Sequence, residues 1–253
     1  MRVENVKAIV TGAASGLGRC FAVELARAGA AVAAGDIDVA GLERLKAECA
    51  DLPGRLLTGK LDISQENSVS AFISEVSGQF DGINVLVNNA GILRDGLLVK
   101  EEGGWVRKLP TAQWKQVIDV NLTGHYLMTR EVATEILKRE IKESVIVNIS
   151  SISNAGNPGQ SNYAASKAGL DACTRTWALE LAHGNIRVGG IAPGVIETPI
   201  LKNISDEAKE NLLEDIPLQR FGAPFEIWQA LRFIIECDYF TGRIIYVDGG
   251  SNF

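Results

Sequence analysis

The sequence predicts a doubly wound α/β fold, in which helices cover both faces of a parallel β-sheet. Short β-branched apolar runs, of the length of buried strands, alternate with amphipathic helical stretches along the chain. Such alternation implies parallel strands joined by right-handed crossovers. The glycine-rich and polar motifs follow directly after strands, and ligands on such sheets bind at the carboxyl ends of the strands. The motifs are therefore expected to meet at one edge of the sheet.

Length and composition limit the class of protein. The chain has 253 residues, of which 46% are hydrophobic and 22% are charged, as expected for one large α/β domain or two small ones. Repeats, linkers and low-complexity segments are absent from the sequence, so we expect a single domain over residues 1–253. The net charge of −6 gives no electrostatic footprint for binding nucleic acid.

Cysteine usage and hydropathy bear on the cellular compartment. The cysteines have no CxxC spacing and predict free thiols in a reducing compartment; they are Cys20, Cys49, Cys173 and Cys237. The chain runs almost directly into a strand and has no long apolar segment, so we expect no signal peptide, no membrane span and a cytoplasmic location. No cluster of His, Cys and carboxylate residues suggests a catalytic metal.

A glycine-rich turn at residues 12–18 separates the first strand, at residues 7–11, from a helix that continues to Ala28. Gly29 ends this helix in the usual C-terminal position. Such a turn lets the backbone approach a pyrophosphate, and the helix N-terminus favours the anion. Glycine turns are common, so the prediction depends on the strand before it and the helix after it.

Asp36 follows the second strand, residues 30–35, and lies 18 residues after Gly18. This spacing is close to that of an acid that binds a ribose. A carboxylate accepts hydrogen bonds from an adenosine ribose diol and repels a 2′-phosphate, by about 1–4 kcal/mol at about 4 Å. The alternative is a solvated aspartate, but the preceding glycine turn favours a cofactor role. We therefore expect NAD(H) as the cofactor, not NADP(H).

Strands and helices continue to alternate through the rest of the chain. The next elements expected are a helix at 39–51, a strand at 56–61, a helix from an N-cap at Ser64 to Gln79, and a strand at 83–87 followed by Asn88-Asn89-Ala90-Gly91. The second half predicts helices at 111–121, 124–142, 161–183, 199–221 and 225–236, and strands at 145–149, 186–192 and 244–247.

Tyr163 and Lys167 are four residues apart near the start of the helix at 161–183. Residues at this spacing share one face of a helix, so the phenol and the ammonium are expected side by side. A nearby cation favours the phenolate and lowers a tyrosine pKa from roughly 10. Such a phenol can exchange a proton with an alcohol or ketone. A surface tyrosine and a solvated lysine are the alternative when this spacing stands alone.

The chain resembles the short-chain dehydrogenases/reductases over essentially its full length. Single motifs are weak evidence, but their order and spacing together are specific. The matching elements are TGAASGLG at 11–18, Asp36, Asp62, NNAG at 88–91, Asn121, the serines at 150 and 151, YxxxK at 163–167 and PGVIET at 193–198. Within the family, GILRDGLL at 91–98 and PGQSNYAASKAGL at 158–170 are most similar to β-ketoacyl reductases and 17β-hydroxysteroid dehydrogenases.

The resemblance implies a single-domain Rossmann fold with a seven-stranded sheet, and a catalytic tetrad of Asn121, Ser151, Tyr163 and Lys167. Tyr163 would be the general acid or base, and Lys167 would lower its pKa and hold the nicotinamide ribose. Ser151 would position the substrate oxygen, and Asn121 would support a water that links the lysine to solvent. The implied cofactor-binding residues are Gly12, Ser15, Gly16, Leu17, Gly18, Asp36, Asp62, Ile63, Asn89, Ala90, Gly91, Tyr163, Lys167, Pro193, Gly194, Ile196 and Thr198.

The choice between Ser150 and Ser151 depends on which part of the motif is rigid. The family usually has its serine thirteen residues before the tyrosine, which indicates Ser150, whereas the strand pattern xxNxSS indicates Ser151. Loops absorb deletions and buried strands do not slip freely. We therefore expect Ser151 to act, with one loop residue lost between 152 and 156.

Two segments differ from the strands, helices and motifs described so far: one departs from the family pattern and the other resembles a lid. Residues 99–110 replace a shorter connection of the family; they are charged, contain Gly103-Gly104 and end in Pro110, which predicts a hairpin-like excursion or a flexible loop. Either a surface elaboration or a role in assembly or substrate access would fit. Residues 199–221 resemble the mobile substrate lid of the family.

The resemblance leaves the substrate open. The expected reaction interconverts a secondary alcohol and a ketone, and the alternative is reduction of a β-ketoacyl thioester on acyl carrier protein or coenzyme A. Carrier-dependent relatives dock an acidic carrier through two basic positions, of which this chain keeps Lys142 but has Gly184 in place of arginine. This difference favours a freely diffusing small molecule or coenzyme-A ester. A non-catalytic dinucleotide sensor on the same fold is the remote alternative.

Family resemblance also implies a homotetramer, or at least a dimer, packed through the helices at 124–142 and 161–183. Neither His125 nor His183 matches a catalytic position of the family, so a Ser-His nucleophilic mechanism is not expected.

Overall fold

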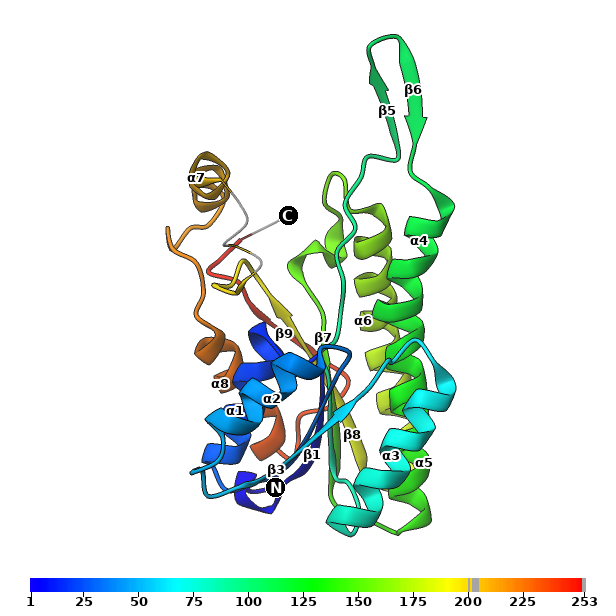
Figure 1. Ribbon diagram of the computed structural model, residues 1–253, viewed down its shortest axis with the longest axis vertical. Helices are drawn as coiled ribbons and strands as arrows, with labels where there is room; N and C mark the ends of the chain where they lie inside the picture. The colour runs from blue at the N-terminus through cyan, green and yellow to red at the C-terminus, as the bar shows by residue number, and fades with distance from the viewer. Residues whose placement is uncertain (200, 202–204, 252–253) are drawn as a thin grey trace.

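A parallel β-sheet forms the centre of the molecule (Figure 1). The computed structural model describes residues 1–199, 201 and 205–251. In this part of the chain, seven strands pair in the order β3-β2-β1-β4-β7-β8-β9. Their bounds are β1 Lys7–Thr11, β2 Ala31–Asp36, β3 Arg55–Lys60, β4 Val85–Asn88, β7 Ser144–Ile149, β8 Ile186–Pro193 and β9 Ile244–Val247. The predicted doubly wound Rossmann fold is confirmed.

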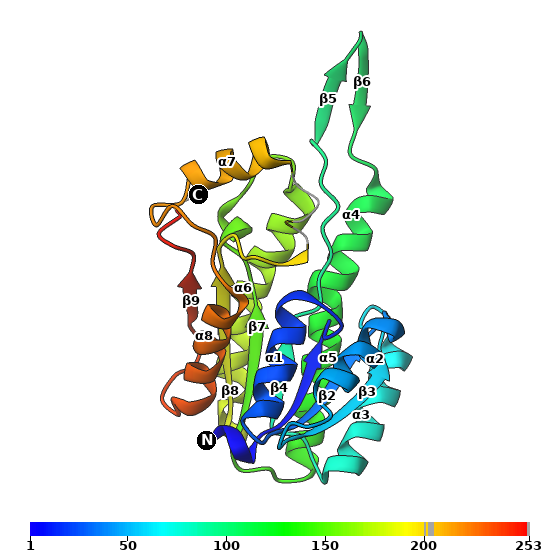
Figure 2. The same ribbon diagram turned by 60° about the vertical axis from the view of Figure 1, so that its left-hand side comes forward.

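Helices cover both faces of this sheet, as Figures 1 and 2 show from two sides. One face packs against α1 (Gly16–Arg27), α2 (Val39–Glu48) and α8 (Pro224–Glu236). The other packs against α3 (Glu66–Phe80), α5 (His125–Lys138) and α6 (Ser161–Leu181). Each layer has its own apolar core, because strands buried on both faces present alternate side chains to opposite sides.

The strand order reverses beside β1, whose neighbours are β2 and β4. Crevices at such reversals, beyond the carboxyl ends of the strands, are where open α/β sheets bind ligands. Thr11 at the end of β1 donates a hydrogen bond to the carbonyl of Val87 (3.3 Å) and accepts from the N–H groups of Asn89 and Ala90 (both 3.0 Å). One buried hydroxyl therefore fixes the ends of both strands that flank the crevice.

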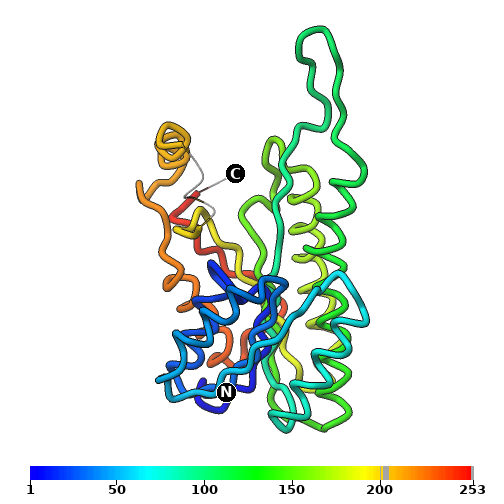
Figure 3. The backbone as a smooth tube through the Cα atoms, in the orientation of Figure 1, coloured from blue at the N-terminus to red at the C-terminus, as the bar shows by residue number. Residues whose placement is uncertain are grey.

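Residues 99–108 form a β-hairpin that projects away from the sheet, and the chain runs out and back along it in Figure 3. Its strands are β5 (Val99–Glu102) and β6 (Trp105–Lys108). Gly103 and Gly104 form the turn, with φ of 59° and 82°, as a two-residue hairpin turn with positive φ requires. The hairpin alternative of the sequence prediction is the one that forms. All eight strand residues are exposed.

The helices predicted at 111–121 and 124–142 are one continuous rod with a π-helical turn in its middle. α4 (Thr111–Ile118) passes through this turn at Asp119–Gly124 into α5. The predicted C-terminal limit at residue 142 is wrong, because Glu140 has a positive φ of 53° and turns the chain toward β7. Single π turns inside α-helices are frequent at functional sites, and this one contains Asn121.

Further boundaries differ from the prediction, among them the end of the helix expected at 39–51, which ends at Glu48. Helix α7 covers only Asp206–Glu214 of the expected lid helix at 199–221, since Pro217 cannot continue it; residues 200 and 202–204 of that segment lie outside the described residues. Ser64 does not cap a helix. Its hydroxyl donates to Asp62 Oδ1 at 2.7 Å, and α3 begins at Glu66 without a side-chain cap.

Candidate active site

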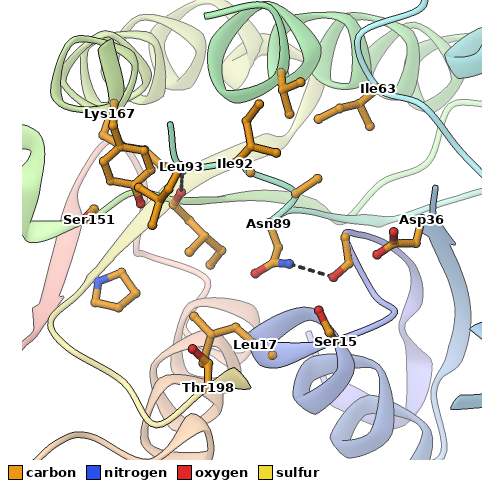
Figure 4. Close-up of a pocket in the computed structure, with 18 of the residues that line it drawn as sticks. Ser15, Leu17, Asp36, Ile63, Asn89, Ile92, Leu93, Ser151, Lys167 and Thr198 are labelled. Carbon is orange, nitrogen blue, oxygen red and sulfur yellow. Dashed lines mark hydrogen bonds between the residues drawn. The ribbon is translucent and has the colours of Figure 1, made fainter. Parts of the chain in front are cut away.

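A cavity of about 450 Å³ lies at the carboxyl ends of the strands, beside the reversal of strand order. Figure 4 shows Lys167 and Ser151 at one end of it, Asp36 at the other, and Asn89 between them. The predicted residues that line it are Gly12, Ser15, Gly16, Leu17, Asp36, Asp62, Ile63, Asn89, Ala90, Gly91, Ser151, Tyr163, Lys167, Pro193, Gly194, Ile196 and Thr198. The structure therefore brings motifs from the whole chain into one cavity.

The glycine turn packs too tightly for a side chain at Gly12 or at Gly18. Gly12 has a φ of 65°, and a Cβ there would lie 2.7 Å from Ala90 Cα. At Gly18, which does not line the cavity, a Cβ would lie 2.1 Å from the carbonyl oxygen of Gly12. Asn89 Nδ2 donates to the carbonyl of Thr11 at 2.9 Å. These contacts place the N-terminus of α1 at the cavity, where its free N–H groups can bind a pyrophosphate.

Asp36 ends β2 and is held by two backbone donors. The N–H of Ala14 donates to Oδ2 and the N–H of Asp38 donates to Oδ1, both at 2.9 Å. A carboxylate has about four acceptor positions, so lone pairs remain on Asp36 for ribose hydroxyls. Ser15 is exposed nearby at the start of α1 and adds no positive charge. The end of the cavity at Asp36 therefore carries a negative charge with acceptor positions still free.

Tyr163 and Lys167 lie one turn apart on α6, as the spacing predicts. Lys167 Nζ is 5.6 Å from the centroid of the Tyr163 ring and donates a hydrogen bond to the carbonyl of Ile149 at 2.7 Å. Only 3% of Lys167 is exposed. Burial lowers the pKa of this ammonium to about 8, and Asp171 opposes that shift.

The predicted lowering of the Tyr163 pKa is wrong for this arrangement. Burial raises the pKa of the phenol, and Asp95 adds to the rise, whereas a hydrogen bond with Ser151 acts in the opposite direction. Lys167 is not among the groups that shift the pKa of Tyr163, and its Nζ is hydrogen-bonded to the carbonyl of Ile149 at the end of β7. Tyr163 therefore carries its proton at neutral pH.

Both serines after β7 line the cavity, but they differ in their partners. Ser150 still belongs to the sheet: its N–H donates to Ile191 at 2.7 Å, and its buried hydroxyl has no partner among the described residues. Ser151 begins the 3₁₀ turn at Ile152–Ala155, accepts a hydrogen bond from the N–H of Ser153 at 3.1 Å, and bonds to Tyr163. Contact with the phenol supports Ser151.

Asn121 does not line the cavity and is fully buried. Its Oδ1 accepts from the N–H of Ile92 at 2.8 Å, and its Nδ2 donates to the carbonyl of Ile92 at 2.9 Å. These two bonds tie the π turn to the segment after β4. The predicted role of Asn121 in a proton path stays a prediction.

Sequence reasoning missed part of the apolar wall of the cavity. The additional lining residues are Ile37, Leu61, Ile92, Leu93, Val120, Ile149 and Pro199; most of them adjoin a predicted motif, which is the signal that could have found them. His125 Nε2 lies 2.7 Å from the carbonyl of Ala90 and donates to it. Burial, then Lys167, lowers the pKa of His125 to about 3, so this ring stays neutral and is unsuited to acid–base chemistry.

Comparison with known proteins decides the family. A family model described as enoyl-(acyl carrier protein) reductase matches residues 12–252. The chain belongs to the short-chain dehydrogenase/reductase family. Members of this family are oxidoreductases that bind a nicotinamide cofactor, so the chain is an oxidoreductase.

Relatives within the short-chain dehydrogenase/reductase family have more than one activity. The 3-oxoacyl-(acyl-carrier-protein) reductase FabG of Thermotoga maritima is 42% identical over 99% of both chains. The protein of that name from Staphylococcus epidermidis is 38% identical over 97% of this chain and 98% of its own. A structure of 7α-hydroxysteroid dehydrogenase with NADH and 7-oxo glycochenodeoxycholic acid superposes with a TM-score of 0.89, at 31% identity over 97% of this chain and 93% of the other.

No helix within the described residues is long and apolar enough to cross a bilayer.

Proposed function

We propose that the protein interconverts a secondary alcohol and a ketone with NAD(H), through one domain over residues 1–253. The observation that supports this is the arrangement of the cavity. Lys167 and Ser151 line one end of it and Asp36 lines the other, and the ring of Tyr163 lies 5.6 Å from Lys167 Nζ. A dinucleotide that spans the cavity would bring its nicotinamide to the three polar side chains.

Each of these side chains has a distinct role in the proposal. The bound nicotinamide supplies or accepts the hydride. Tyr163 gives its proton to the carbonyl oxygen of the substrate, and its raised pKa favours this direction, ketone reduction, at neutral pH. Ser151 holds the same oxygen by a hydrogen bond, Lys167 holds the nicotinamide ribose, and Asn121 supports a water that links the lysine to solvent.

Asp36 gives a testable preference for NAD(H). We expect the wild-type protein to show a higher kcat/KM with NADH than with NADPH. Asp36→Asn keeps an acceptor but loses the charge that repels a 2′-phosphate, so the preference should fall by roughly tenfold or more. Asp38→Asn is the matched control: it lies in the same loop, but its carboxylate caps α2 by accepting from Gly41, and the preference should not change. An NADPH preference of the wild-type protein would contradict the proposal.

Ser151 is expected to matter more than Ser150. Loss of one positioned donor to the reacting oxygen costs about 10²-fold or more in kcat, so Ser151→Ala should be nearly inactive. Ser150→Ala should remain close to wild type, because its hydroxyl makes no bond within the described residues. Steady-state kinetics of both variants decide the matter, and an inactive Ser150→Ala beside an active Ser151→Ala would reverse the choice.

A 3-oxoacyl thioester reductase is the second candidate function, favoured by the 42% identity to the Thermotoga maritima reductase. Against carrier dependence, Gly184 provides no cation at the end of α6, where the next basic group is the exposed His183, and the net charge of −6 does not attract an acidic carrier. We propose a freely diffusing ketone, alcohol or coenzyme-A ester as the substrate.

One comparison tests both candidates. Purified protein and NADH are offered a panel of ketones, together with one 3-oxoacyl chain on carrier protein, on coenzyme A and on a small thiol. We expect the carrier form to have no advantage in kcat/KM. An advantage of tenfold or more would make the protein a carrier-dependent reductase, and no turnover of any of them would overturn the oxidoreductase mechanism.

We also propose a cytoplasmic homotetramer, or at least a dimer, packed through α5 and α6. Large apolar side chains are exposed on these helices: Tyr126, Leu137 and Leu179, the last with 82% of its surface accessible. Light scattering is expected to give a multiple of the 27.2 kDa chain mass, and a monomer at micromolar concentration would refute the assembly. Replacing residues 100–107 by a short turn tests whether the hairpin contributes to this assembly.

A further inference from the structure

Lys167 poses an electrostatic problem that its known contacts do not solve. The side chain is 3% exposed, and the carbonyl of Ile149 is the only hydrogen-bond acceptor found for Nζ among the described residues. An ammonium has three donors, and a buried charge is costly unless it is paired. A neutral carbonyl supplies no countercharge. The environment must therefore provide an anion.

The titratable groups around Lys167 come from two elements. α5 contributes His125, which is neutral because its pKa is about 3. α6 contributes Tyr163, whose raised pKa keeps it protonated, and Asp171. β7 contributes only the backbone carbonyl of Ile149. Asp171 is thus the negative charge that faces the lysine, one helical turn further along α6.

Asp171 is itself buried in an unusual way. It is 5% exposed, and its Oδ2 accepts a hydrogen bond from Asn154 Nδ2. Its Oδ1 is buried and has no hydrogen-bond partner among the described residues. A buried carboxylate is seldom retained without a cation. Lys167 and Asp171 are two buried groups of opposite charge four residues apart on α6, and no hydrogen bond joins them directly within the described residues.

Asn154 links this pair to the substrate end of the cavity. It lies in the 3₁₀ turn at Ile152–Ala155, directly after Ser151. Besides Asp171, its Nδ2 donates to the hydroxyl of Tyr246 on β9, at 2.9 Å. One amide group thus joins the active-site helix, the turn after Ser151 and the last strand of the sheet.

We propose that Asp171 is a positioning residue of the active site: it is the buried countercharge of Lys167, and through Asn154 it also holds the turn that carries Ser151. Nothing in the sequence motif YxxxK requires an acid four residues after the lysine. The inference rests on the proposed function for its kinetic consequences, but the charge pairing can be measured without turnover.

The sign of the expected pH effect follows from the two opposing influences on Lys167. Burial lowers the pKa of Lys167 to about 8, and Asp171 raises it. Without the carboxylate, the pKa falls further, by roughly one unit or more. The protonated lysine is then lost as the pH rises through neutrality. The alkaline limb of kcat/KM should move to lower pH by the same amount.

The experiment compares Asp171→Asn, Asp171→Glu and Asn154→Ala. The titration of Lys167 is followed by NMR of lysine labelled at Cε, assigned with Lys167→Met, and the pH profile of kcat/KM is measured in parallel. Asp171→Asn should lower the midpoint by about one unit or more. Asp171→Glu, which keeps the charge, should restore the wild-type midpoint. Asn154→Ala should reduce kcat through Ser151 but leave the midpoint within a few tenths of a unit.

An unchanged Lys167 midpoint in Asp171→Asn would overturn the proposal, and so would an equal fall in Asn154→Ala. If Asp171→Asn does not fold, Asp171→Leu carries the same expectation, because an apolar residue of similar volume leaves no polar group unpaired. A wild-type protein that turns over no substrate would overturn the proposed function, and the lysine titration would still decide on Asp171.

Discussion

Replacing Tyr163 by phenylalanine is expected to lower kcat by about 10²- to 10⁴-fold, which is the usual contribution of a positioned proton donor. The substitution removes one oxygen from a partly buried ring and leaves its packing on α6 intact. Affinity for NADH should therefore change little. A turnover assay measures the fall in kcat, and the change in NADH fluorescence on binding measures the affinity for NADH.

Tyr126→Phe is the matched control for this experiment. Tyr126 is an exposed tyrosine on α5, 44% accessible and paired with Arg130, so the variant should keep wild-type kinetics. If Tyr163→Phe kept more than a tenth of the wild-type rate, the proton would have to come from another group, and the assignment of Tyr163 would fail.

The parts of the site that depend on short spacings could be predicted from the sequence. The glycine turn, Asp36 and the pair Tyr163–Lys167 each follow from one strand end or one helical turn, which the chain specifies locally. The sheet then brings them together, because parallel strands end at a common edge. Knowledge of the fold class was therefore enough to predict one shared cavity.

Properties that depend on burial could not be predicted in this way. The spacing of Tyr163 and Lys167 indicated a lowered tyrosine pKa, but burial raises it, and the Nζ of Lys167 is bonded to Ile149. In the same way, the sequence predicts Asn121 only as a helix residue. Its side chain makes two bonds to Ile92, which lies 29 positions away in the sequence. Such effects arise only when distant segments pack.

The surface elements also divide into those that local sequence predicts and those that depend on tertiary packing. Two adjacent glycines were enough to indicate the hairpin at 99–108, because a two-residue turn with positive φ favours them. The end of α5 was not visible, since Glu140 adopts its left-handed conformation to meet β7 and not by its own preference. Local chemistry sets turns, and tertiary connections set where helices stop.

Lys167→Met is expected to produce the largest combined loss, because the lysine serves both binding and structure. Weakened contact with the nicotinamide ribose should raise the Kd for NADH, and kcat should fall as well. The substitution also leaves Asp171 buried without a cation. Removing one partner of a buried ion pair in direct contact typically costs about 3–5 kcal/mol of stability. Because no hydrogen bond joins Lys167 and Asp171 directly within the described residues, the free energy of unfolding should fall by less than that in urea titrations.

A double variant separates the two losses. In Lys167→Met/Asp171→Leu, both charges are replaced by apolar groups of similar size, which is often neutral or stabilising relative to a buried pair. The free energy of unfolding should therefore return to near the wild-type value, while activity and NADH affinity stay low.

Thr174→Val on the same helix is the control. It breaks the buried hydrogen bond from Asn148 to Thr174 but leaves both charges in place, so its loss of unfolding free energy should simply add to that of Lys167→Met. Additive losses in the Lys167–Asp171 cycle as well would mean that the two charges do not interact, and that Lys167 is stabilised by Ile149 alone.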